Sequence, residues 1–351
     1  MTSERPAVLL AFDERVRQNY IDEADLARLK GLADWDWFPC SGGGIYSGNE
    51  DPAAAQALAD RLAQVDALVV CHGCPVVDET VLQQAPRLRL IGELEGDRFA
   101  SRIDLPAAWN RGLRTVDTTN GSSYPVAEWA LGLILVSLRN AGQHFRRIIG
   151  GQKQLPHDSD PGYLNGELFG KRVGLIGCGH IGRRLIKFLR PFETDIWVHD
   201  PYLPGEMADA LDFNLTSLEN VLGQCHVVVC LAPQTPSTEG LLGTQELAHL
   251  RPGAVLVNVS RGKVIDSDAL MARLEQGDIV AGLDVFDPEP FGDHPITQLD
   301  NVFLTPHIAG VVAASYPRFF NLMVDELERF FNGHTTLFDL TDRSRANRQG
   351  D

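Results

Sequence analysis

The chain has few basic residues for its length. Its 351 residues include 31 lysines and arginines against 47 aspartates and glutamates, which gives a formal net charge of −16. Nucleic acids and anionic membrane surfaces bind proteins through a basic face, so this balance argues against both as partners. Anionic small molecules stay compatible with it, because they respond to local charge.

The sequence also lacks a long apolar run. The longest one, 126–138, contains Glu128 and is shorter than the ~18–20 residues that span a membrane, so we expect a buried helix. The apolar run 7–12 is too short for a secretory signal. Only six cysteines occur, mostly inside apolar segments where a free thiol behaves as a small hydrophobe. These absences favour a reduced, cytoplasmic protein.

Short apolar runs alternate with longer amphipathic ones along the whole chain. Apolar strands that alternate with helices predict parallel sheets covered on both faces. The expected strands are 7–12, 67–70, 88–92, 113–117, 172–177, 195–200, 226–232, 254–260, 279–285 and 301–306. A chain of this length exceeds what one core usually supports, so we expect an α/β protein with two doubly wound domains. A turn, a Ser cap and a proline at 120–125 mark a boundary between them.

Residues 172–182 carry a dinucleotide-binding pattern. Gly177, Gly179 and Gly182 form G-x-G-x-x-G directly after an apolar strand and at the start of an amphipathic helix, 181–189. The first glycine suits a tight turn, the second lets the backbone approach a pyrophosphate, and the third permits close packing of helix against strand. The start of the helix offers N–H groups to the phosphates.

The next expected strand ends in Asp200, 18 residues after Gly182. An aspartate at this place accepts hydrogen bonds from the adenosine ribose and repels a 2′-phosphate. The pattern therefore predicts NAD rather than NADP as the cofactor. A glycine turn and a strand-end aspartate in some other α/β protein are the alternative.

The later strand ends of this domain carry further functional groups. Ligands of open α/β sheets bind at the carboxyl ends of the strands. Pro233 lies in a proline-rich loop after the third strand, and the fourth strand leads to Arg261. The fifth strand leads to Asp284 and Glu289, and the sixth leads to His307. We expect these side chains to converge on the edge where the cofactor binds.

Arg261, Glu289 and His307 are the candidate catalytic residues. The planar fork of an arginine binds a carboxylate with two hydrogen bonds. A histidine donates a proton near neutral pH, and a carboxylate beside it favours the protonated ring and fixes its orientation. The set suits reduction of a ketone that bears a carboxylate. Each residue taken alone has a structural interpretation: an ion-pair partner, a strand-end hydrogen bond or a solvated acidic turn.

These segments resemble the D-isomer-specific 2-hydroxyacid dehydrogenases, the family of phosphoglycerate, glyoxylate/hydroxypyruvate, D-lactate and formate dehydrogenases. The N-terminal part is similar mainly in pattern. The matching segments, in the order of the family, are Tyr124-Pro-Val-Ala-Glu-Trp-Ala-Leu-Gly-Leu, Val173-Gly-Leu-Ile-Gly-Cys-Gly-His-Ile-Gly, Val198-His-Asp-Pro-Tyr, Val257-Asn-Val-Ser-Arg-Gly, Leu283-Asp-Val-Phe-Asp-Pro-Glu-Pro and Leu304-Thr-Pro-His-Ile-Ala-Gly.

The resemblance implies a Rossmann NAD-binding domain over 124–311, inserted into a flavodoxin-like substrate domain that begins with 1–123. A C-terminal helix within 312–340 would return to the substrate domain, and the polar tail 341–351 would be disordered. The resemblance further implies hydride transfer between NAD and a 2-keto or 2-hydroxy acid. It also implies a homodimer with the helix 126–138 in its interface.

The resemblance also implies roles for single residues. Arg261 would bind the carboxylate and carbonyl oxygen of the substrate, His307 would be the acid/base, and Glu289 would be its partner. The residues implied or predicted to contact NAD are Gly177, Gly179, His180, Ile181, Gly182, Asp200, Pro233, Val259, Ser260, Arg261, Asp284 and His307.

One loop departs from the family. Members commonly carry a short glycine–valine loop, whose amides hold the substrate carboxylate, after the strand that corresponds to 88–92. Here the segment 93–104 is longer and charged. We expect this loop to affect the choice of substrate, with Gly96 in contact with it and Arg98 or Arg102 binding an additional anionic group. Both arginines facing solvent is the alternative.

Cys71 and Cys74 form a C-x-x-C sequence. A structural zinc site would need two more ligands at recognisable spacing, so we expect no metal, and a redox role is a minor alternative. We expect a loop of the substrate domain in which His72, Gly73 and Cys74 line the substrate pocket and the protein is sensitive to thiol reagents.

Two other functions stay open. The first is an NAD(H)-sensing regulatory binding protein of the same fold, although the chain has no evident basic segment for DNA. The second is another dehydrogenase chemistry, such as formate or phosphite oxidation. The Glu289–His307 pair disfavours the second, because it suits proton exchange with a hydroxyl group.

Overall fold

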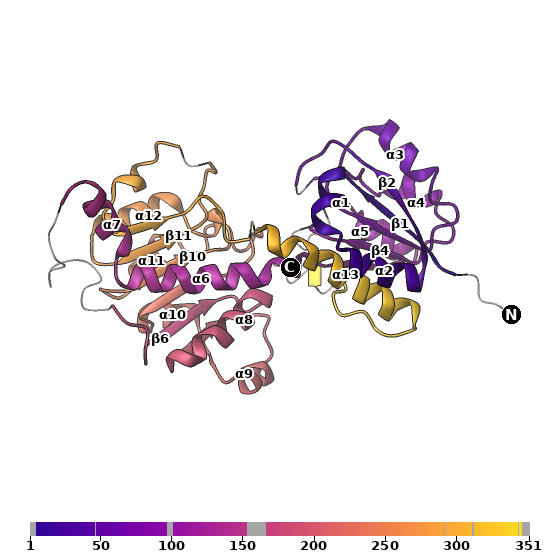
Figure 1. Ribbon diagram of the computed structural model, residues 1–351. Helices are drawn as coiled ribbons and strands as arrows, with labels where there is room; N and C mark the ends of the chain where they lie inside the picture. Colours follow the sequence, from indigo (N-terminus) through magenta and orange to yellow (C-terminus); the bar gives the residue numbers. More distant parts are fainter. Residues whose placement is uncertain are drawn as a thin grey trace. The chain divides into compact units, whose positions relative to one another are not determined.

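The computed structural model describes residues 5–45, 47–96, 101–152, 166–290, 292–310, 312–342 and 344–345 (Figure 1). The chain divides into two compact units. The first unit consists of the described residues of Met1–Ser122 and Ala313–Arg345, and the second consists of those of Ser123–Val312. Each unit contains one parallel sheet.

The sheet of the first unit has five parallel strands in the order β2-β1-β3-β4-β5, which is the flavodoxin-like order. Its strands are β1 (Ala7–Phe12), β2 (Asp34–Pro39), β3 (Ala67–Val70), β4 (Leu90–Glu93) and β5 (Arg114–Asp117). The sequence interpretation missed β2. This strand pairs only with β1 at the edge of the sheet, and exposed and partly buried residues alternate along its first half.

Helices cover both faces of this sheet. One apolar core includes residues of α3 (Pro52–Ala59), α4 (Glu79–Gln83) and α5 (Leu105–Asn110). The core on the other face includes residues of α1 (Glu14–Tyr20), α2 (Glu23–Leu32) and α13 (Tyr316–Phe331). The first five helices each begin after an aspartate whose carboxylate accepts a backbone N–H, namely Asp13, Asp22, Asp51, Asp78 and Asp104.

The sheet of the second unit has seven parallel strands in the order β12-β11-β10-β9-β6-β7-β8. Its strands are β6 (Arg172–Ile176), β7 (Asp195–His199), β8 (Asn214–Leu215), β9 (Val227–Cys230), β10 (Val255–Asn258), β11 (Val280–Leu283) and β12 (Val302–Leu304). The order reverses between β6 and β9, as in a Rossmann fold with one added edge strand. The carboxyl ends of β6 and β9 therefore lie beside the switch point where dinucleotides bind.

One face of the seven-stranded sheet is covered by α6 (Ser123–Leu138), α8 (His180–Leu189) and α9 (Gly205–Leu211), and α7 (Ala141–Ile149) packs against α6 and β12. The other face is covered by α10 (Leu218–Gln224), α11 (Thr244–Ala248) and α12 (Ser267–Glu275). Short 3₁₀ helices occupy Thr119–Ser122, Arg190–Phe192, Gly262–Val264, Pro295–Gln298 and Ala313–Ser315. The predicted fold class, two doubly wound parallel-sheet domains, is confirmed.

The structure describes only parts of the two polar segments 150–166 and 341–351. Of the loop expected over 150–166, residues 153–165 lie outside the described residues. In the tail, the side chain of Ser344 donates to the carbonyl of Thr341, and the N–H of Arg345 donates to the same residue, whereas 346–351 lie outside the described residues. Among the described helices, none has the length and apolar character needed to cross a membrane.

Candidate active site

The glycine turn between β6 and α8 requires glycine at two of its three positions. Gly177 has φ +92°, and a Cβ on it would lie 3.0–3.1 Å from the backbone of Leu231 and Ala232. A Cβ on Gly182 would lie 3.0 Å from the carbonyl of Gly177, which is the close packing of helix on strand that the sequence predicted. By contrast, a Cβ on Gly179 would meet no atom within 4 Å.

The open space at Gly179 fits a pyrophosphate. Gly179 is the N-cap of α8, so no side chain caps the first turn of this ten-residue helix at His180 and Ile181. Helix N-termini present N–H groups and partial positive charge to anions. The turn therefore has the room and the polarity that a dinucleotide phosphate needs.

Asp200 is joined to this turn by hydrogen bonds. Its Oδ2 accepts the N–H of Cys178 at 2.9 Å, and its Oδ1 accepts the N–H of Tyr202 at 3.0 Å. Asp200 follows β7 directly and stays partly exposed. Each carboxylate oxygen has a further lone pair, so the group can also accept from a ribose hydroxyl.

Asn258, a residue to which the sequence interpretation gave no role, shapes the turn after β10. Its Oδ1 accepts both the N–H and the hydroxyl of Ser260, at 3.0 and 2.9 Å, and its Nδ2 donates to the carbonyl of Arg261 at 3.1 Å. Arg261 then donates from Nη1 to the Ser260 carbonyl at 2.7 Å. Val259 is buried beneath this turn. Pro233, after β9, accepts the hydroxyl of Thr238 at 2.5 Å.

Asp284 is buried under the segment that carries His307. Its Oδ1 accepts the hydroxyl of Thr305 at 2.5 Å and the N–H of Ile308 at 3.0 Å, and its Oδ2 accepts the N–H of Ala309 at 2.9 Å. The backbone carbonyl of Asp284 accepts the N–H of His307 at 2.8 Å. These bonds fix His307, whose backbone lies in the left-handed region at φ +53°.

Glu289 and His307 are brought together. Nδ1 of His307 lies 2.9 Å from Oε2 of Glu289, and the two side chains are 39% and 34% exposed. The other carboxylate oxygen, Oε1, accepts the N–H of Phe286 at 2.8 Å. The ring therefore has a carboxylate on one nitrogen, and the other nitrogen, Nε2, points away from that bond. An imidazole held in this way can carry and transfer a proton.

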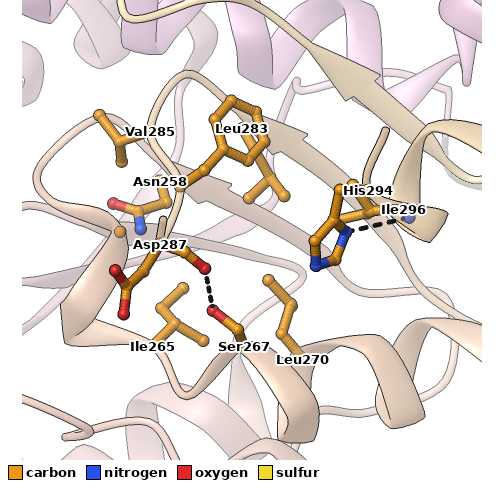
Figure 2. A pocket seen from close by; sticks show the side chains of 11 residues that line it. Asn258, Ile265, Ser267, Leu270, Leu283, Val285, Asp287, His294 and Ile296 are labelled. Atoms are coloured by element: carbon orange, nitrogen blue, oxygen red, sulfur yellow. Dashed lines mark hydrogen bonds between the residues drawn. The ribbon is translucent and has the colours of Figure 1, made fainter. Parts of the chain in front are cut away.

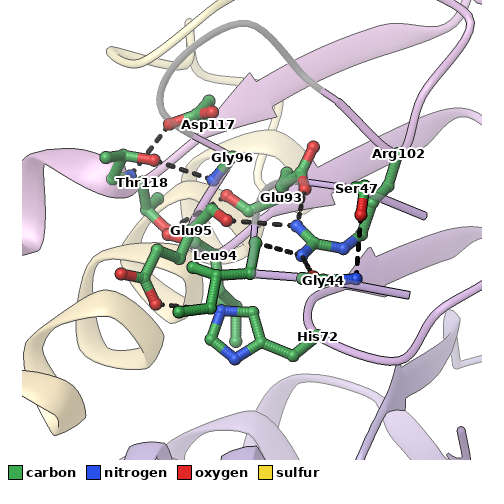
Figure 3. A network of polar contacts seen from close by, with 12 residues as sticks. Gly44, Ser47, His72, Glu93, Leu94, Glu95, Gly96, Arg102, Asp117 and Thr118 are labelled. Atoms are coloured by element: carbon green, nitrogen blue, oxygen red, sulfur yellow. Dashed lines mark hydrogen bonds and ion pairs between the residues drawn. The ribbon is translucent and has the colours of Figure 1, made fainter. Parts of the chain in front are cut away.

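In the first unit, His72 lies near Glu95 (Figure 3), and Tyr20 joins them through a hydrogen bond. Nε2 of His72 lies 3.1 Å from Oε2 of Glu95, and the Tyr20 hydroxyl donates to the same oxygen at 2.5 Å. Burial raises the pKa of the Glu95 carboxyl, but the hydrogen bonds from His72 and Tyr20 outweigh it, so the pKa is lowered. Gly96, in the same loop, donates its N–H to Oγ1 of Thr119 at 2.9 Å.

Arg102 forms a buried ion pair with Glu93, and neither side chain is exposed. The guanidinium also donates to the backbone carbonyls of Gly44, Ile45 and Glu95. The expectation that Arg102 binds an anionic group of the substrate is wrong, because these partners occupy it inside the unit. Arg98, the other candidate, lies outside the described residues.

The C-x-x-C segment is buried. Cys71 and Cys74 have no exposed surface, and burial raises the pKa of both thiols well above the usual range. Protonated, buried thiols react slowly, which opposes the expected sensitivity to thiol reagents. Gly73 has φ +82° and lies against the backbone of Cys40 and Ser41. Within the described residues, no group of three His, Cys, Asp or Glu side chains could hold a metal ion.

Comparisons with known proteins agree with this geometry. Residues 131–309 match the family model described as "D-isomer specific 2-hydroxyacid dehydrogenase, NAD binding domain". The D-3-phosphoglycerate dehydrogenase of Methanocaldococcus jannaschii is 30% identical over 280 residues, which are 79% of this chain and 52% of that protein. The glyoxylate reductase of Pyrococcus horikoshii is 30% identical over 289 residues, 82% of this chain and 86% of that one.

Among solved structures, a phosphoglycerate oxidoreductase from Rhizobium etli aligns with a TM-score of 0.80 at 25% identity, over 96% of this chain and 98% of that chain. The chain spans about half the length of the phosphoglycerate dehydrogenases that it matches. It spans most of the length of the glyoxylate reductases.

Proposed function

Because the chain belongs to the D-isomer-specific 2-hydroxyacid dehydrogenase family, with its NAD-binding domain over 131–309, we propose that it interconverts a 2-keto acid and a D-2-hydroxy acid with NAD as cofactor. The observation that carries this proposal is the His307–Glu289 pair. Glu289 follows β11 and His307 follows β12, at the same carboxyl edge of the sheet as the glycine turn after β6. This pair also favours an enzyme over a dinucleotide-sensing regulator, because a sensor needs no proton donor.

We assign the second unit as the nucleotide domain. Gly177, Gly179, His180, Ile181 and Gly182 hold the pyrophosphate at the start of α8. Asp200 accepts from the ribose, and its charge disfavours a 2′-phosphate, which selects NAD over NADP. The remaining cofactor contacts in this assignment are Pro233, Val259, Ser260, Arg261, Asp284 and His307. When bound, NADH supplies the hydride.

The residues of the chain do the rest of the chemistry. Arg261 clamps the substrate carboxylate with its planar fork and polarises the carbonyl to be reduced. His307 donates the proton to the carbonyl oxygen from Nε2, because Nδ1 faces Glu289 at 2.9 Å. The contact with Glu289 holds the orientation of the ring. In the opposite direction His307 accepts the proton from the hydroxyl group.

We assign the first unit as the substrate domain, with His72, Gly73 and Gly96 as substrate contacts; the expected contact of Cys74 is dropped, because its side chain has no exposed surface. The support is the partly exposed His72–Glu95 pair, whose side chains are 11% and 18% exposed. Since Gly96 donates its N–H to Thr119, its contact with a substrate would come from other atoms.

We also propose a homodimer with α6 and α7 in the interface. Phe145, Ile148 and Ile149 on α7 are 64–70% exposed, and apolar patches of this kind mark protein interfaces. Light scattering of the protein and of an Ile148→Glu variant tests this: a monomeric wild type contradicts it.

A cytoplasmic location is supported by the six thiols, all of which are free.

The activity is tested by following NADH oxidation with a panel of 2-keto acids: glyoxylate, hydroxypyruvate, pyruvate, phosphonylated acids and aromatic acids. We expect turnover with at least one acceptor and a loss of about 10²-fold or more in His307→Ala. Absence of turnover with every acceptor, or full activity in His307→Ala, contradicts the proposal.

A further inference from the structure

The Arg261 turn and the Glu289 loop meet at Gly262. A Cβ built on Gly262 would overlap the carbonyl of Phe286 and lie 2.6 Å from the nitrogen of Asp287. Real Cβ atoms essentially never come within 3.0 Å of a backbone atom. The backbone of Phe286 and Asp287 thus occupies the space that any other side chain at this position would need. The φ angle of Gly262 lies outside the left-handed region, so the requirement for glycine comes from the close approach.

The residue that touches Gly262 also holds the Glu289 carboxylate. Phe286 donates its N–H to Oε1 of Glu289 at 2.8 Å, and Oε2 of Glu289 lies 2.9 Å from Nδ1 of His307. A displacement of Phe286 would therefore move the carboxylate relative to the imidazole. Gly262 directly follows Arg261, so the contact joins the loop of the carboxylate clamp to the loop that carries Glu289.

A hydrogen bond also ties this segment to α12. Phe286 and Asp287 border a cavity of about 30 Å³ that is also lined by Leu270 and His294 (Figure 2). The hydroxyl of Ser267, the first residue of α12, donates to the carbonyl of Asp287 at 2.8 Å. The Gly262 contact and this hydrogen bond therefore both act on the position of the segment.

We propose that Gly262 is a positioning residue that places the Glu289 carboxylate against His307. This inference rests on the proposed function. Because the contact is between backbones, it sets the spacing of the two loops more rigidly than a contact between long side chains, which would lose rotamer freedom. A side chain at position 262 would change the pairing of Glu289 with His307 even where the fold and the cofactor site persist.

The test compares Gly262→Ala with Gly205→Ala. Gly205 begins α9 in the same unit, is exposed, and a Cβ on it would meet nothing within 4 Å. The measurements are kcat against pH for the best 2-keto acid, NADH binding by fluorescence, and thermal unfolding. We expect Gly262→Ala to lower kcat about tenfold or more and to move the alkaline limb of its pH profile to lower pH. Binding of NADH should stay within about threefold, and Gly205→Ala should match the wild type in all three measurements.

Ser267→Ala keeps the inference testable if Gly262→Ala does not fold, and a double variant tests the route of the effect where Gly262→Ala folds. Ser267→Ala removes the hydrogen bond to Asp287 without adding atoms, and it should shift the pH profile in the same direction by a smaller amount. In a Glu289→Gln background, Gly262→Ala should add no further pH shift, because the carboxylate through which it acts is gone.

The outcomes separate the two levels of the proposal. A wild type that reduces no 2-keto acid overturns the proposed function and this inference with it. If the wild type is active, the inference alone is overturned when Ser267→Ala, and Gly262→Ala if it folds, bind NADH and keep the wild-type pH profile. A loss of kcat without a change in the pH profile has the same meaning, since a merely structural role of Gly262 would produce it.

Discussion

The Nδ1 atom of His307 lies 2.9 Å from Oε2 of Glu289, while Oε1 of the same carboxylate accepts the N–H of Phe286 at 2.8 Å. One end of the carboxylate is thus fixed by its own loop, and the other end faces the imidazole. Both side chains are more than one-third exposed, so a substrate can reach the ring. The two contacts are already formed without a substrate, as the proposed proton transfer requires.

Replacing Glu289 by glutamine tests the charge of this pair, because it keeps the shape of the side chain and removes the carboxylate. We expect kcat for reduction to fall about 10–100-fold and the alkaline limb of the pH profile to move to lower pH. Steady-state rates across the neutral and alkaline range measure both effects. Asp287→Asn removes a carboxylate from the same loop and should leave the profile unchanged; an unshifted profile in Glu289→Gln contradicts the assignment.

Asp284 should act on the proton donor through the backbone. Its buried carboxylate accepts N–H groups of Ile308 and Ala309, and an amide at this position turns one acceptor into a donor that faces an N–H. We expect Asp284→Asn to lower the free energy of unfolding by about 1–3 kcal/mol and to reduce kcat. Thr305→Val removes one donor to the Asp284 carboxylate and the acceptor of the Trp129 indole N–H, but it leaves the bonds of Asp284 to Ile308 and Ala309 in place, so it should have a smaller effect on kcat. Unfolding and rate measurements on the two variants decide this, and equal effects on kcat would contradict it.

The charge of Asp200 should set the choice of dinucleotide. Asp200→Asn keeps an oxygen that can accept from Cys178 or Tyr202, so the glycine turn should persist. Without the negative charge, a 2′-phosphate is no longer repelled, and we expect the ratio of kcat/KM for NADPH to that for NADH to rise about tenfold or more. Asp209→Asn on the exposed face of α9 is the matched control. An unchanged ratio in Asp200→Asn means that other residues select the cofactor.

The second unit was largely predictable from the sequence. Its central strands are buried on both faces and therefore read as continuous apolar runs, and the residues that follow them at the carboxyl ends must share one edge. The edge strand β8 was missed because it has only two residues, both exposed. The support that Asn258 and Asp284 give to their loops was also missed, since it depends on which backbone groups face each side chain.

The first unit was less predictable where charge is buried. Arginine side chains usually lie at the surface. The burial of Arg102 depends on Glu93, nine residues earlier, and on the backbone carbonyls of Gly44 and Ile45. These partners come from the end of β4 and from a loop far away in the sequence, so no local pattern indicates them. The edge strand β2 was missed for a related reason: the segment Asp-Trp-Asp-Trp-Phe-Pro alternates, and the apolar runs of central strands are absent from it.

The buried pair of Glu93 and Arg102 predicts a dependence of stability on pH. Burial raises the pKa of Glu93 to about 7, against a usual value of 4.5, and the charge of Arg102 offsets this only in part. The folded-state pKa is the higher one. The contribution of Glu93 to stability is therefore fully present below about pH 4.5 and is lost as the pH rises through about 7.

Glu93→Gln removes this titration. The difference in the free energy of unfolding, wild type minus variant, should therefore fall by roughly 3 kcal/mol as the pH rises from about 4.5 through about 7. Urea unfolding followed by fluorescence measures it, with Trp129 and Trp197 replaced by phenylalanine so that the remaining tryptophans report on the first unit. Glu95→Gln should show the opposite trend, because the pKa of Glu95 is lowered and its contribution is lost as the pH falls. A difference that stays constant with pH in Glu93→Gln would show that Glu93 does not titrate in this range.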